Sequence, residues 1–338
     1  MSTTYRVGLV GAGGIANAHG NACQQAPSAE LAAICDVSEN ALANFGERFD
    51  VAPENRYLSL EEMLDAENLD IAVICTWGAF HAEVGIQLSE SRQVKAILCE
   101  KPFTSTAAEA EAFVSAAQEN GVLVAEAFKF RHHPMHLKAK ELIDSGAIGD
   151  FKAIRSTFCT GGGGGPETRR PEMNWRFNKA KGGGSIYDLA CYNIHHARFM
   201  FGAEPIRVSG MSQAGLEVDD GSYLLLVFPG ERVAQISTGF NCAGGQYAEM
   251  SGTGGMCRLD RVWNNENTAV NIELTTREGT EIIDFEPCFQ FALQLEHMCE
   301  VVGTGKPHRI SPESCVNQMR VIDAAFEAMA TGRTVELG

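Results

Sequence analysis

A glycine-rich turn near the start of the chain restricts its possible folds more than any other feature of the sequence. The segment Gly11-Ala12-Gly13-Gly14-Ile15-Ala16 directly follows the apolar run 6–10 and opens a helical pattern. It fits G-x-G-x-x-A, in which the first glycine permits a tight turn and the second lets a pyrophosphate approach the backbone. The last small residue allows close packing of helix on strand. The alternative is a turn with a purely structural role, but the strand–turn–helix context favours a dinucleotide site at Gly11, Gly13, Gly14 and Ile15.

Strand and helix patterns alternate over the first 127 residues. Five short apolar runs, each followed by a turn or a helix start, are candidate strands: 6–10, 30–36, 71–75, 96–99 and 123–127. Ser59-Leu60-Glu61-Glu62 and Thr106-Ala107-Ala108-Glu109 fit the capping box that starts a helix. This alternation predicts an α/β fold in which residues 1–127 form an N-terminal Rossmann dinucleotide-binding domain with a parallel sheet.

Residues 128–338 show a different pattern, in which strands follow one another directly. A helix around 136–144 precedes segments with period-two alternation at 152–159, 206–211, 222–228, 233–240 and 246–251. Asp219-Asp220-Gly221 and Pro229-Gly230 are predicted turns between these strands. Helices are expected over about 186–201 and from residues 289 and 312 onward. The pattern predicts a C-terminal α+β domain with a large, mostly antiparallel, open-faced sheet.

Charge and cysteine content narrow the classes of function. The chain has 27 Lys and Arg against 43 Asp and Glu, a net charge of −16, which disfavours nucleic-acid binding. Its eleven cysteines include no C-x-x-C pair, which indicates reduced thiols, not a disulfide framework. We see no signal peptide and no run of about 18 apolar residues, so we expect a cytoplasmic protein without a membrane segment.

Asp36 bears on the choice of cofactor. It ends the second predicted strand, at the distance from the glycines where a carboxylate accepts hydrogen bonds from the adenosine ribose and repels a 2′-phosphate. The alternative role for Asp36 is a helix or turn cap. No arginine follows in residues 37–40 to hold a 2′-phosphate, so the sequence predicts NAD as the preferred cofactor, with NADP as the alternative.

Short motifs along almost the whole chain together resemble the glucose-fructose oxidoreductase/inositol dehydrogenase (Gfo/Idh/MocA) family. The most specific of them is Cys99-Glu100-Lys101-Pro102, which looks like the E-K-P signature of that family. The others are the N-terminal glycines, Thr76 and His81, Glu126-Ala127-Phe128 with Arg131 and Pro134, Trp175-Arg176-Phe177, and the run Gly182 to Tyr192. The resemblance implies cofactor contacts at Thr76, His81, Glu100 and Lys101. It also implies a substrate site that includes Lys101, Trp175, Arg176, Asp188, Tyr192 and His195.

Three of these residues have the chemistry that oxidation of an alcohol requires. Lys101 follows a predicted parallel strand, where α/β sheets bind ligands, and its charge can stabilise an alkoxide. Asp188 and Tyr192 are four residues apart, so on a helix they project from one face. Many family members have a histidine four residues after this Asp, whereas the branch with glucose-fructose oxidoreductase and dimeric dihydrodiol dehydrogenase has Tyr. We therefore expect Tyr192 to be the general acid/base, Lys101 its electrostatic partner and Asp188 a substrate anchor; packing and capping roles are the alternatives.

Other signals are weaker. His195 lies three residues after Tyr192 and His196 four, so either histidine could serve as the base, or both could be packing residues. Trp77 stands where the family often has Pro or Asn. The histidines of 132–136 flank a proline without the spacing of a zinc site, so no metal is expected there. The loop Gly161–Gly165 is a candidate lid or contact loop.

These observations predict an NAD(P)-dependent oxidoreductase that transfers a hydride between nicotinamide and a hydroxyl-bearing carbon of a sugar, inositol or related polyol or diol. Two alternatives remain: a glycosidase that uses bound NAD transiently, and a non-catalytic sensor with a Rossmann fold. The resemblance implies that residues 128–338 bind the substrate and form a homodimer or homotetramer through the open face of the sheet.

Overall fold

The computed structural model describes residues 4–161, 166–243 and 245–338, and it divides the chain into two compact units. Unit 1 combines Met1–His132 with Phe289–Val316, and unit 2 combines His133–Cys288 with Asn317–Gly338. The sequence pattern suggested two successive pieces that meet after residue 127. The observed units are discontinuous instead, because a segment from near the C-terminus packs into unit 1.

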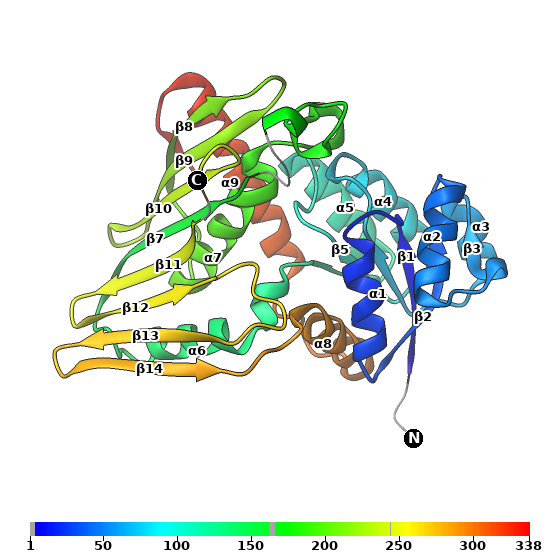
Figure 1. The fold of residues 1–338 in the computed structure, drawn as a ribbon, viewed down its shortest axis with the longest axis horizontal. Coiled ribbons are helices and arrows are strands. Elements are labelled where there is room, and N and C mark those ends of the chain that lie inside the picture. Colours follow the sequence, from blue (N-terminus) through cyan, green and yellow to red (C-terminus); the bar gives the residue numbers. More distant parts are fainter. Residues whose placement is uncertain (1–3, 162–165, 244) are drawn as a thin grey trace. The chain divides into compact units, whose positions relative to one another are not determined.

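Unit 1 contains the six-stranded parallel sheet that the alternating pattern predicts (Figure 1). The strand order is β3-β2-β1-β4-β5-β6, which is the arrangement of dinucleotide-binding Rossmann folds. The strands are β1 (Tyr5–Val10), β2 (Ala29–Cys35), β3 (Arg56–Tyr57), β4 (Ile71–Ile74), β5 (Ala96–Cys99) and β6 (Leu123–Glu126). Its helices are α1 (Ala16–Gln25), α2 (Glu39–Phe49), α3 (Leu60–Ala66), α4 (His81–Ser91), α5 (Ala107–Glu119) and α8 (Gln290–Thr304). Only the two-residue strand β3 is absent from the predicted strands.

Local capping fixes where these helices start. Ser59 Oγ accepts a hydrogen bond from the Glu62 amide at 3.2 Å, and the Thr106 hydroxyl accepts one from the Glu109 amide at the same distance. The Glu109 carboxylate in turn accepts a hydrogen bond from the Ser105 amide at 2.9 Å. Both predicted starts of helices are therefore correct, and each satisfies an amide that the helix itself leaves unpaired.

Helix α8 completes the core of unit 1 from the far end of the sequence. Phe291, Leu295 and Met298 of α8 are buried together with Val7 and Leu9 of β1. At the surface of the same contact, Glu296 accepts hydrogen bonds from Ser28 Oγ at 2.6 Å and the Ser28 amide at 3.1 Å. Burial of such side chains contributes about 2 kcal/mol each. Residues from α8 are therefore an integral part of the unit that carries the glycine turn.

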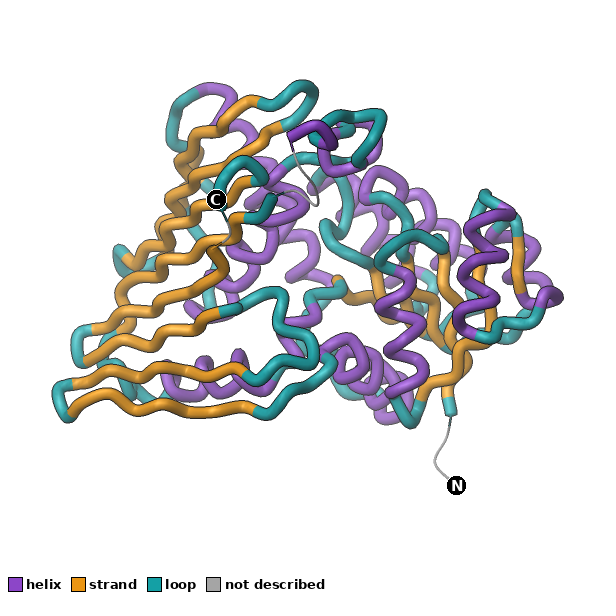
Figure 2. The backbone as a smooth tube through the Cα atoms, in the orientation of Figure 1, coloured by secondary structure: helices purple, strands orange, loops and turns teal. Residues whose placement is uncertain are grey.

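Unit 2 is built on a nine-stranded, mostly antiparallel sheet, as the period-two segments predict (Figure 2). The order is β14-β13-β12-β11-β7-β10-β9-β8-β15, and the pair β7–β10 is parallel. The strands are β7 (Phe151–Cys159), β8 (Arg207–Ala214), β9 (Asp219–Phe228), β10 (Arg232–Gly239), β11 (Gly245–Gly252), β12 (Gly255–Asp260), β13 (Val270–Thr276), β14 (Gly279–Phe285) and β15 (Val335–Glu336). Helices α6 (Pro134–Asp144) and α7 (Cys191–Phe201) contact strands β13 and β7 of this sheet. Helix α9 (Pro312–Thr331), which belongs to unit 2 from residue 317 onward, precedes β15.

Two details of unit 2 differ from the sequence prediction. Asp219-Asp220-Gly221, a predicted turn, lies inside β9, because the Asp219 carboxylate is buried in hydrogen bonds and needs no exposed loop. The predicted helix 186–201 begins with a π-helical turn over Ile186–Ala190, and α7 follows it directly. Among the described helices of both units, none is long and apolar enough to cross a membrane.

Candidate active site

The glycine turn has the geometry of a dinucleotide cradle. Gly11 has φ +101°, and a Cβ atom there would lie 2.8 Å from the backbone carbonyl of Cys75, so no other residue fits without displacement. Gly13 and Gly14 are exposed, and a Cβ at either position would meet no heavy atom within 4 Å. Ile15 is the N-cap of α1, whose first residue, Ala16, is fully buried. The turn therefore offers open space and free amides at a positive helix end, which a pyrophosphate requires.

Asp36 lies beside this turn and is already hydrogen-bonded within the chain. Its Oδ2 accepts a hydrogen bond from the Ala12 amide at 2.7 Å, and its Oδ1 accepts one from the Ser38 amide at 2.8 Å. Ser38 in turn caps α2 by accepting a hydrogen bond from the Ala41 amide at 3.3 Å. Of the two roles that the sequence left as alternatives, the structure shows the stabilisation of the turn. Asp36 holds the glycine turn in place, and each carboxylate oxygen still has a lone pair for a ribose hydroxyl.

A hollow of about 500 Å³ opens between the glycine turn and α2. Its wall on α2 includes Asn40, Asn44 and Arg48, which are four residues apart and so share one helix face. Gly13 and Ser38 form the opposite side. Arg48 is a site residue that the sequence analysis missed, because the search for a phosphate-binding arginine stopped at residue 40. The i, i+4, i+8 spacing on the helix after Asp36 is the signal that would have found it.

Two loops at the carboxyl ends of β4 and β5 are joined by His81. Its Nδ1 lies 2.8 Å from the Pro102 carbonyl oxygen, and its Nε2 lies 3.1 Å from the Thr76 carbonyl oxygen. Burial lowers the pKa of His81 although the two carbonyl groups oppose the shift, so the neutral ring donates to one carbonyl at a time. His81 therefore positions the loops that carry Thr76 and Lys101. Thr76 Oγ1 is buried without a hydrogen-bond partner in the described part of the chain. Such a hydroxyl is suited to a hydrogen bond with a bound cofactor.

Glu100, the residue before Lys101, is hydrogen-bonded to His19 of helix α1. The Glu100 carboxylate is 4% exposed, and its Oε1 lies 2.8 Å from His19 Nε2. Burial raises the pKa of Glu100, but the His19 hydrogen bond and the Lys101 charge outweigh burial and bring it below the ordinary value. The Lys101 amide donates to Glu100 Oε2 at 3.2 Å, and the Lys101–Pro102 peptide is cis. Glu100 therefore acts on the site by fixing the backbone of Lys101.

In unit 2, the predicted substrate residues Arg176 and Asp188 are paired with each other. Arg176 Nε donates to Asp188 Oδ2 at 2.8 Å, and the guanidinium carbon lies 4.9 Å from the centre of the Trp175 ring. The Asp188 side chain is 8% exposed and that of Arg176 is 34% exposed. The structure thus brings together Trp175, Arg176 and Asp188, three of the residues that the family resemblance marks.

The turn that carries Asp188 is π-helical, so the strict i, i+4 alignment expected for Asp188 and Tyr192 does not apply. π-Helical turns are rare and are frequent at functional sites. The buried Asp219 carboxylate holds this turn, because its Oδ2 accepts hydrogen bonds from Ser185 Oγ at 2.5 Å and the Ile186 amide at 2.9 Å. Burial raises the pKa of Asp219, and the hydrogen bonds from Ser185 and Ser222 oppose that shift.

The glycines before this turn serve its packing within the chain. A Cβ at Gly183 would lie 2.6 Å from the carbonyl oxygens of Trp175 and Arg176. Gly184 has φ +121°, and its amide donates to the Arg176 carbonyl at 2.8 Å. A Cβ at Gly184 would instead lie 2.6 Å from Asp219 Oδ1, so the two glycines fit the turn against residues 175–176 and against Asp219, and thereby position the Arg176–Asp188 pair.

Tyr192 is the second residue of α7 and is surrounded by aromatic rings. Its ring lies 5.7 Å from those of Phe158 and Trp263, and the side chain retains 8% exposure. Trp263 is fully buried and donates from Nε1 to the Thr157 carbonyl at 3.2 Å. Apolar walls of this kind fix the direction of a phenol and exclude water from its ring face. Trp263 was not foreseen, because it lies 71 positions after Tyr192 in the sequence.

The two histidines after Tyr192 are buried. His195 is 1% exposed, with Nδ1 3.4 Å from an Arg198 nitrogen, and Arg198 pairs with Glu204 and Gln318. His196 is fully buried, 5.3 Å from the rings of His136 and Trp263. These surroundings favour packing roles for both. In the loop Gly161–Gly165, residues 162–165 lie outside the described part of the chain.

Comparison with known proteins agrees with this geometry. Residues 5–128 match the family model "Oxidoreductase family, NAD-binding Rossmann fold", and residues 136–258 match "GFO/IDH/MocA C-terminal domain". The chain is 28% identical to D-xylose 1-dehydrogenase (NADP(+)) 2 of Haloferax volcanii, over 98% of this chain and 99% of the relative. It is 29% identical to trans-1,2-dihydrobenzene-1,2-diol dehydrogenase of Mus musculus, over 79% and 78%.

A solved structure extends the similarity to three dimensions. The aldose-aldose oxidoreductase of Caulobacter crescentus, complexed with glycerol, superposes with a TM-score of 0.87 at 25% identity and covers 99% of this chain and 100% of that one. The predicted fold class, the NAD(P) cofactor and the enzyme class are thereby confirmed. The chain belongs to the GFO/IDH/MocA family of oxidoreductases, which carry an NAD-binding Rossmann fold.

Proposed function

We propose that this protein oxidises a ring or anomeric hydroxyl of an aldose, inositol or cyclic trans-diol with NAD, and catalyses the reverse reduction. The observation that carries the proposal is the arrangement at the carboxyl ends of β4 and β5. There, Lys101 is fixed by Glu100, and the loop with Thr76 is fixed by His81. Relatives of the chain that act on D-xylose and on a cyclic diol support this substrate class.

An exposed aromatic pair in the same loop supports a ring substrate. Trp77 is 45% exposed and Phe80 is 43% exposed, and their ring centres lie 6.3 Å apart. Gly78 lies between them, and a Cβ there would be 3.4 Å from the Pro102 ring, so the pair adjoins the loop of Lys101. Flat aromatic faces bind the C–H face of a sugar ring or diol by dispersion and burial.

The proposed mechanism assigns one role to each polar residue. When bound, the nicotinamide would supply the hydride acceptor for oxidation and, in its reduced form, the donor for the reverse reaction. Tyr192, as phenolate, takes the hydroxyl proton during oxidation and returns it to the carbonyl oxygen during reduction. The Lys101 ammonium stabilises the phenolate and the alkoxide. Asp188, oriented by Arg176, accepts a hydrogen bond from a neighbouring substrate hydroxyl.

The test follows absorbance of reduced nicotinamide across aldoses, inositols, anhydro sugars and trans-diols, with NAD and NADP in parallel. We expect NADH formation with at least one ring substrate and a higher kcat/KM with NAD than with NADP. Release of free sugar from glycosides without net NADH would overturn the proposal in favour of an NAD-assisted glycosidase. Bound NAD with no turnover on any substrate would favour a sensor.

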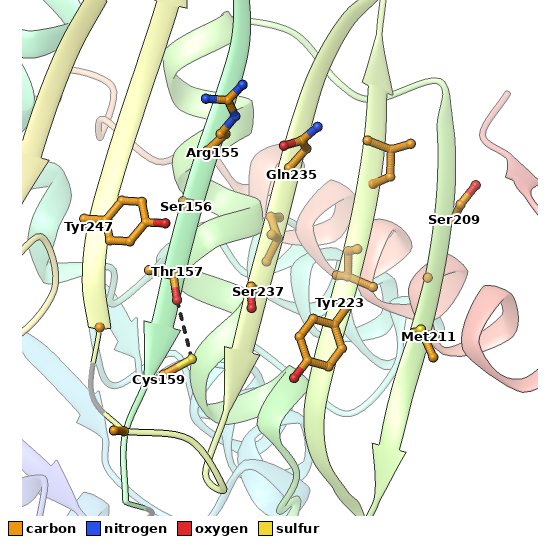
Figure 3. Close-up of a pocket in the computed structure, with 16 residues that line it drawn as sticks. Arg155, Ser156, Thr157, Cys159, Ser209, Met211, Tyr223, Gln235, Ser237 and Tyr247 are labelled. Atoms are coloured by element: carbon orange, nitrogen blue, oxygen red, sulfur yellow. Dashed lines mark hydrogen bonds between the residues drawn. The ribbon is translucent and has the colours of Figure 1, made fainter.

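We also propose that the protein forms a homodimer or homotetramer through the open face of the nine-stranded sheet. Figure 3 shows this face, where Arg155, Gln235, Tyr223 and Tyr247 project from neighbouring strands around a shallow pocket of about 650 Å³. Met211 and Leu225 are 64% and 40% exposed there. Side chains alternate between the two faces of a strand, so Leu225 is exposed on this face while Leu224 and Leu226 are buried in the core.

Light scattering after gel filtration tests the assembly with Leu225→Glu. We expect this charge to shift the mass toward the monomer, because it replaces an exposed apolar side chain on this face. Leu58→Glu, at a 44% exposed site in unit 1, is the control and leaves the mass unchanged. A parent protein that is monomeric at all concentrations contradicts the proposal.

The proposed location is the cytoplasm. The eleven cysteines, all free thiols, support it.

A further inference from the structure

Three histidines from distant parts of the sequence meet in unit 1. His132 ends the short helical turn Lys129–His132, His297 lies on α8, and His308 follows α8 in the loop before α9. One ring nitrogen from each lies within 4.8 Å of the other two. His132 and His297 are separated by 165 residues, so the sequence spacing gives no sign of the cluster.

Several separations within the cluster are close to those around one tetrahedral metal ion. Two nitrogens at about 2.05 Å from a tetrahedral ion lie roughly 3.3 Å apart, and their imidazole ring centres lie roughly 5 Å apart. His132 Nε2 is 3.2 Å from His297 Nδ1. The three pairs of ring centres are separated by 5.1, 5.6 and 4.6 Å. A hydrogen bond between two imidazoles explains the first distance, but it leaves the third ring without a role.

The third ring can act as a metal ligand in one of its two tautomers. His308 Nδ1 lies 3.1 Å from both the carbonyl oxygen and the amide nitrogen of Ile310. With the proton on Nδ1, the ring donates to the carbonyl and the lone pair lies on Nε2; with the proton on Nε2, Nδ1 accepts from the amide. Ligating histidines usually donate their second nitrogen to a carbonyl or carboxylate in this way. His308 Nε2 is buried and has no hydrogen-bond partner among the residues that the structure describes. His132 is 3% exposed, and its Nδ1 is likewise buried without such a partner.

We propose that His132, His297 and His308 form a binding site for one divalent transition-metal ion, with zinc as the preferred occupant. His132 Nε2, His297 Nδ1 and His308 Nε2 supply three ligands, and water occupies the fourth position. Three neutral imidazoles suit zinc, copper, nickel and cobalt, whereas magnesium and calcium prefer oxygen ligands. Such an ion would join the 129–132 turn, α8 and the 308–310 loop.

The charged groups near the site moderate the expected affinity. Arg131 and Arg309 repel a cation, and Arg131 also donates to the Arg309 carbonyl at 3.0 Å. Glu300, one turn after His297 on α8, attracts it while pairing with Lys306 at 3.5 Å. Burial lowers the pKa of His308 to about 3, so its ring is neutral at pH 7. We expect binding in the micromolar range, since no ligand carries a negative charge.

The test titrates zinc and cobalt into metal-stripped, tag-free protein by calorimetry, and records the cobalt absorption spectrum. Cys242→Ser/Cys288→Ser serves as the parent, because these are the two cysteines that are not fully buried. His297→Gln and His308→Gln remove one nitrogen each from sites that retain exposure. Glu300→Gln is the matched control on the same helix, since it changes the local charge and keeps all three nitrogens.

We expect one ion per chain, a cobalt spectrum without a thiolate charge-transfer band, and a rise in Tm when zinc is added. Each histidine variant should weaken binding at least tenfold and abolish the rise in Tm, whereas Glu300→Gln should weaken it less than tenfold. Unfolding of the metal-free variants, followed by circular dichroism, verifies that they fold. The proposal is overturned if the parent binds no metal, or if both histidine variants bind it as tightly as the parent does.

Discussion

The glycine turn of unit 1 and the Asp188 turn of unit 2 provide functional groups in opposite ways. The glycine turn offers empty space and backbone amides from the contiguous residues 11–16, with Asp36 as a hydrogen-bond partner of the Ala12 amide. The Asp188 turn offers side chains that are already held by Arg176 and by the packing of Gly183 on residues 175–176. A site made of backbone is thus contiguous in the sequence, whereas a site made of paired side chains depends on several segments.

The largest expected effect concerns the reacting proton in unit 2. Tyr192→Phe should lower kcat by about 10³-fold, since general acid/base catalysis contributes roughly 10² to 10⁴-fold. The apparent Kd for NAD should not change, because the glycine turn lies in unit 1. Stopped-flow kinetics and a fluorescence titration of NAD measure the two quantities. Tyr187→Phe, in the π-helical turn that precedes α7, is the control; equal activity of both variants would remove Tyr192 from this role.

The next largest effect should come from the backbone site. Gly11→Ala introduces a Cβ 2.8 Å from a backbone carbonyl at φ +101°, which should cost about 3 kcal/mol and abolish measurable NAD binding. Gly121→Ala is the control, because its φ is +70° and nothing lies within 4 Å of its Cβ. It should cost only about 1 kcal/mol. If urea unfolding gives both variants the same loss in free energy of unfolding, the close approach at Gly11 adds nothing to the cost of its positive φ.

Glu100 links the two kinds of site, because a buried side chain fixes the backbone of Lys101. Glu100→Gln should cost about 2 kcal/mol at pH 7, as expected for a buried hydrogen bond to a charged group. The folded-state pKa of Glu100 lies below its ordinary value of 4.5. Its contribution is therefore present above that value and is lost as pH falls through the lower, folded-state pKa. Urea unfolding of parent and Glu100→Gln from pH 7 to pH 3 should show the difference shrinking. A constant difference, or an equal one for the exposed Glu119→Gln, would contradict this prediction.

The same contrast explains how far the sequence could be interpreted. The glycine turn, Asp36 and the strands of unit 1 follow from local patterns, and the predicted strand 96–99 has the observed bounds. Strands β12–β14 were missed, although each pairs with its neighbour in the sequence and Val270–Thr276 alternates buried with less buried positions. The contacts of Arg176 with Asp188 and of Glu100 with His19 could not be predicted, since only the folded chain brings these residues together.

A smaller effect should follow when the ion pair of unit 2 is broken. Arg176→Met and Asp188→Asn form a double-mutant cycle, and we expect a coupling energy of about 1 kcal/mol, because Arg176 is one-third exposed. If Asp188 also binds substrate, Asp188→Asn should raise KM more than Arg176→Met does. Arg155→Met breaks the pair with Glu249 at 3.0 Å and is the control for stability. A coupling energy near zero would reduce the pair to two independent residues.

The smallest expected effect distinguishes the two charged residues beside the glycine turn. The Asp36 carboxylate would repel a 2′-phosphate, whereas Arg48, which lines the hollow beside the glycine turn, would attract one. We expect Asp36 to dominate, because the backbone amides of Ala12 and Ser38 hold it next to the ribose position. Arg48→Ala should therefore lower kcat/KM with NADP about fivefold, or about 1 kcal/mol, and change the value with NAD less than twofold.

Steady-state kinetics with both cofactors decides between these charges, with the neighbouring Glu47→Ala as the control. Equal losses with NAD and NADP would mean that Arg48 contacts the pyrophosphate or the adenine, and not a 2′-phosphate. A parent enzyme that prefers NADP, and loses that preference in Arg48→Ala, would show that a side chain on α2 outweighs Asp36. In that case the cofactor choice, like the Asp188 turn, would depend on side chains that the folded chain brings together.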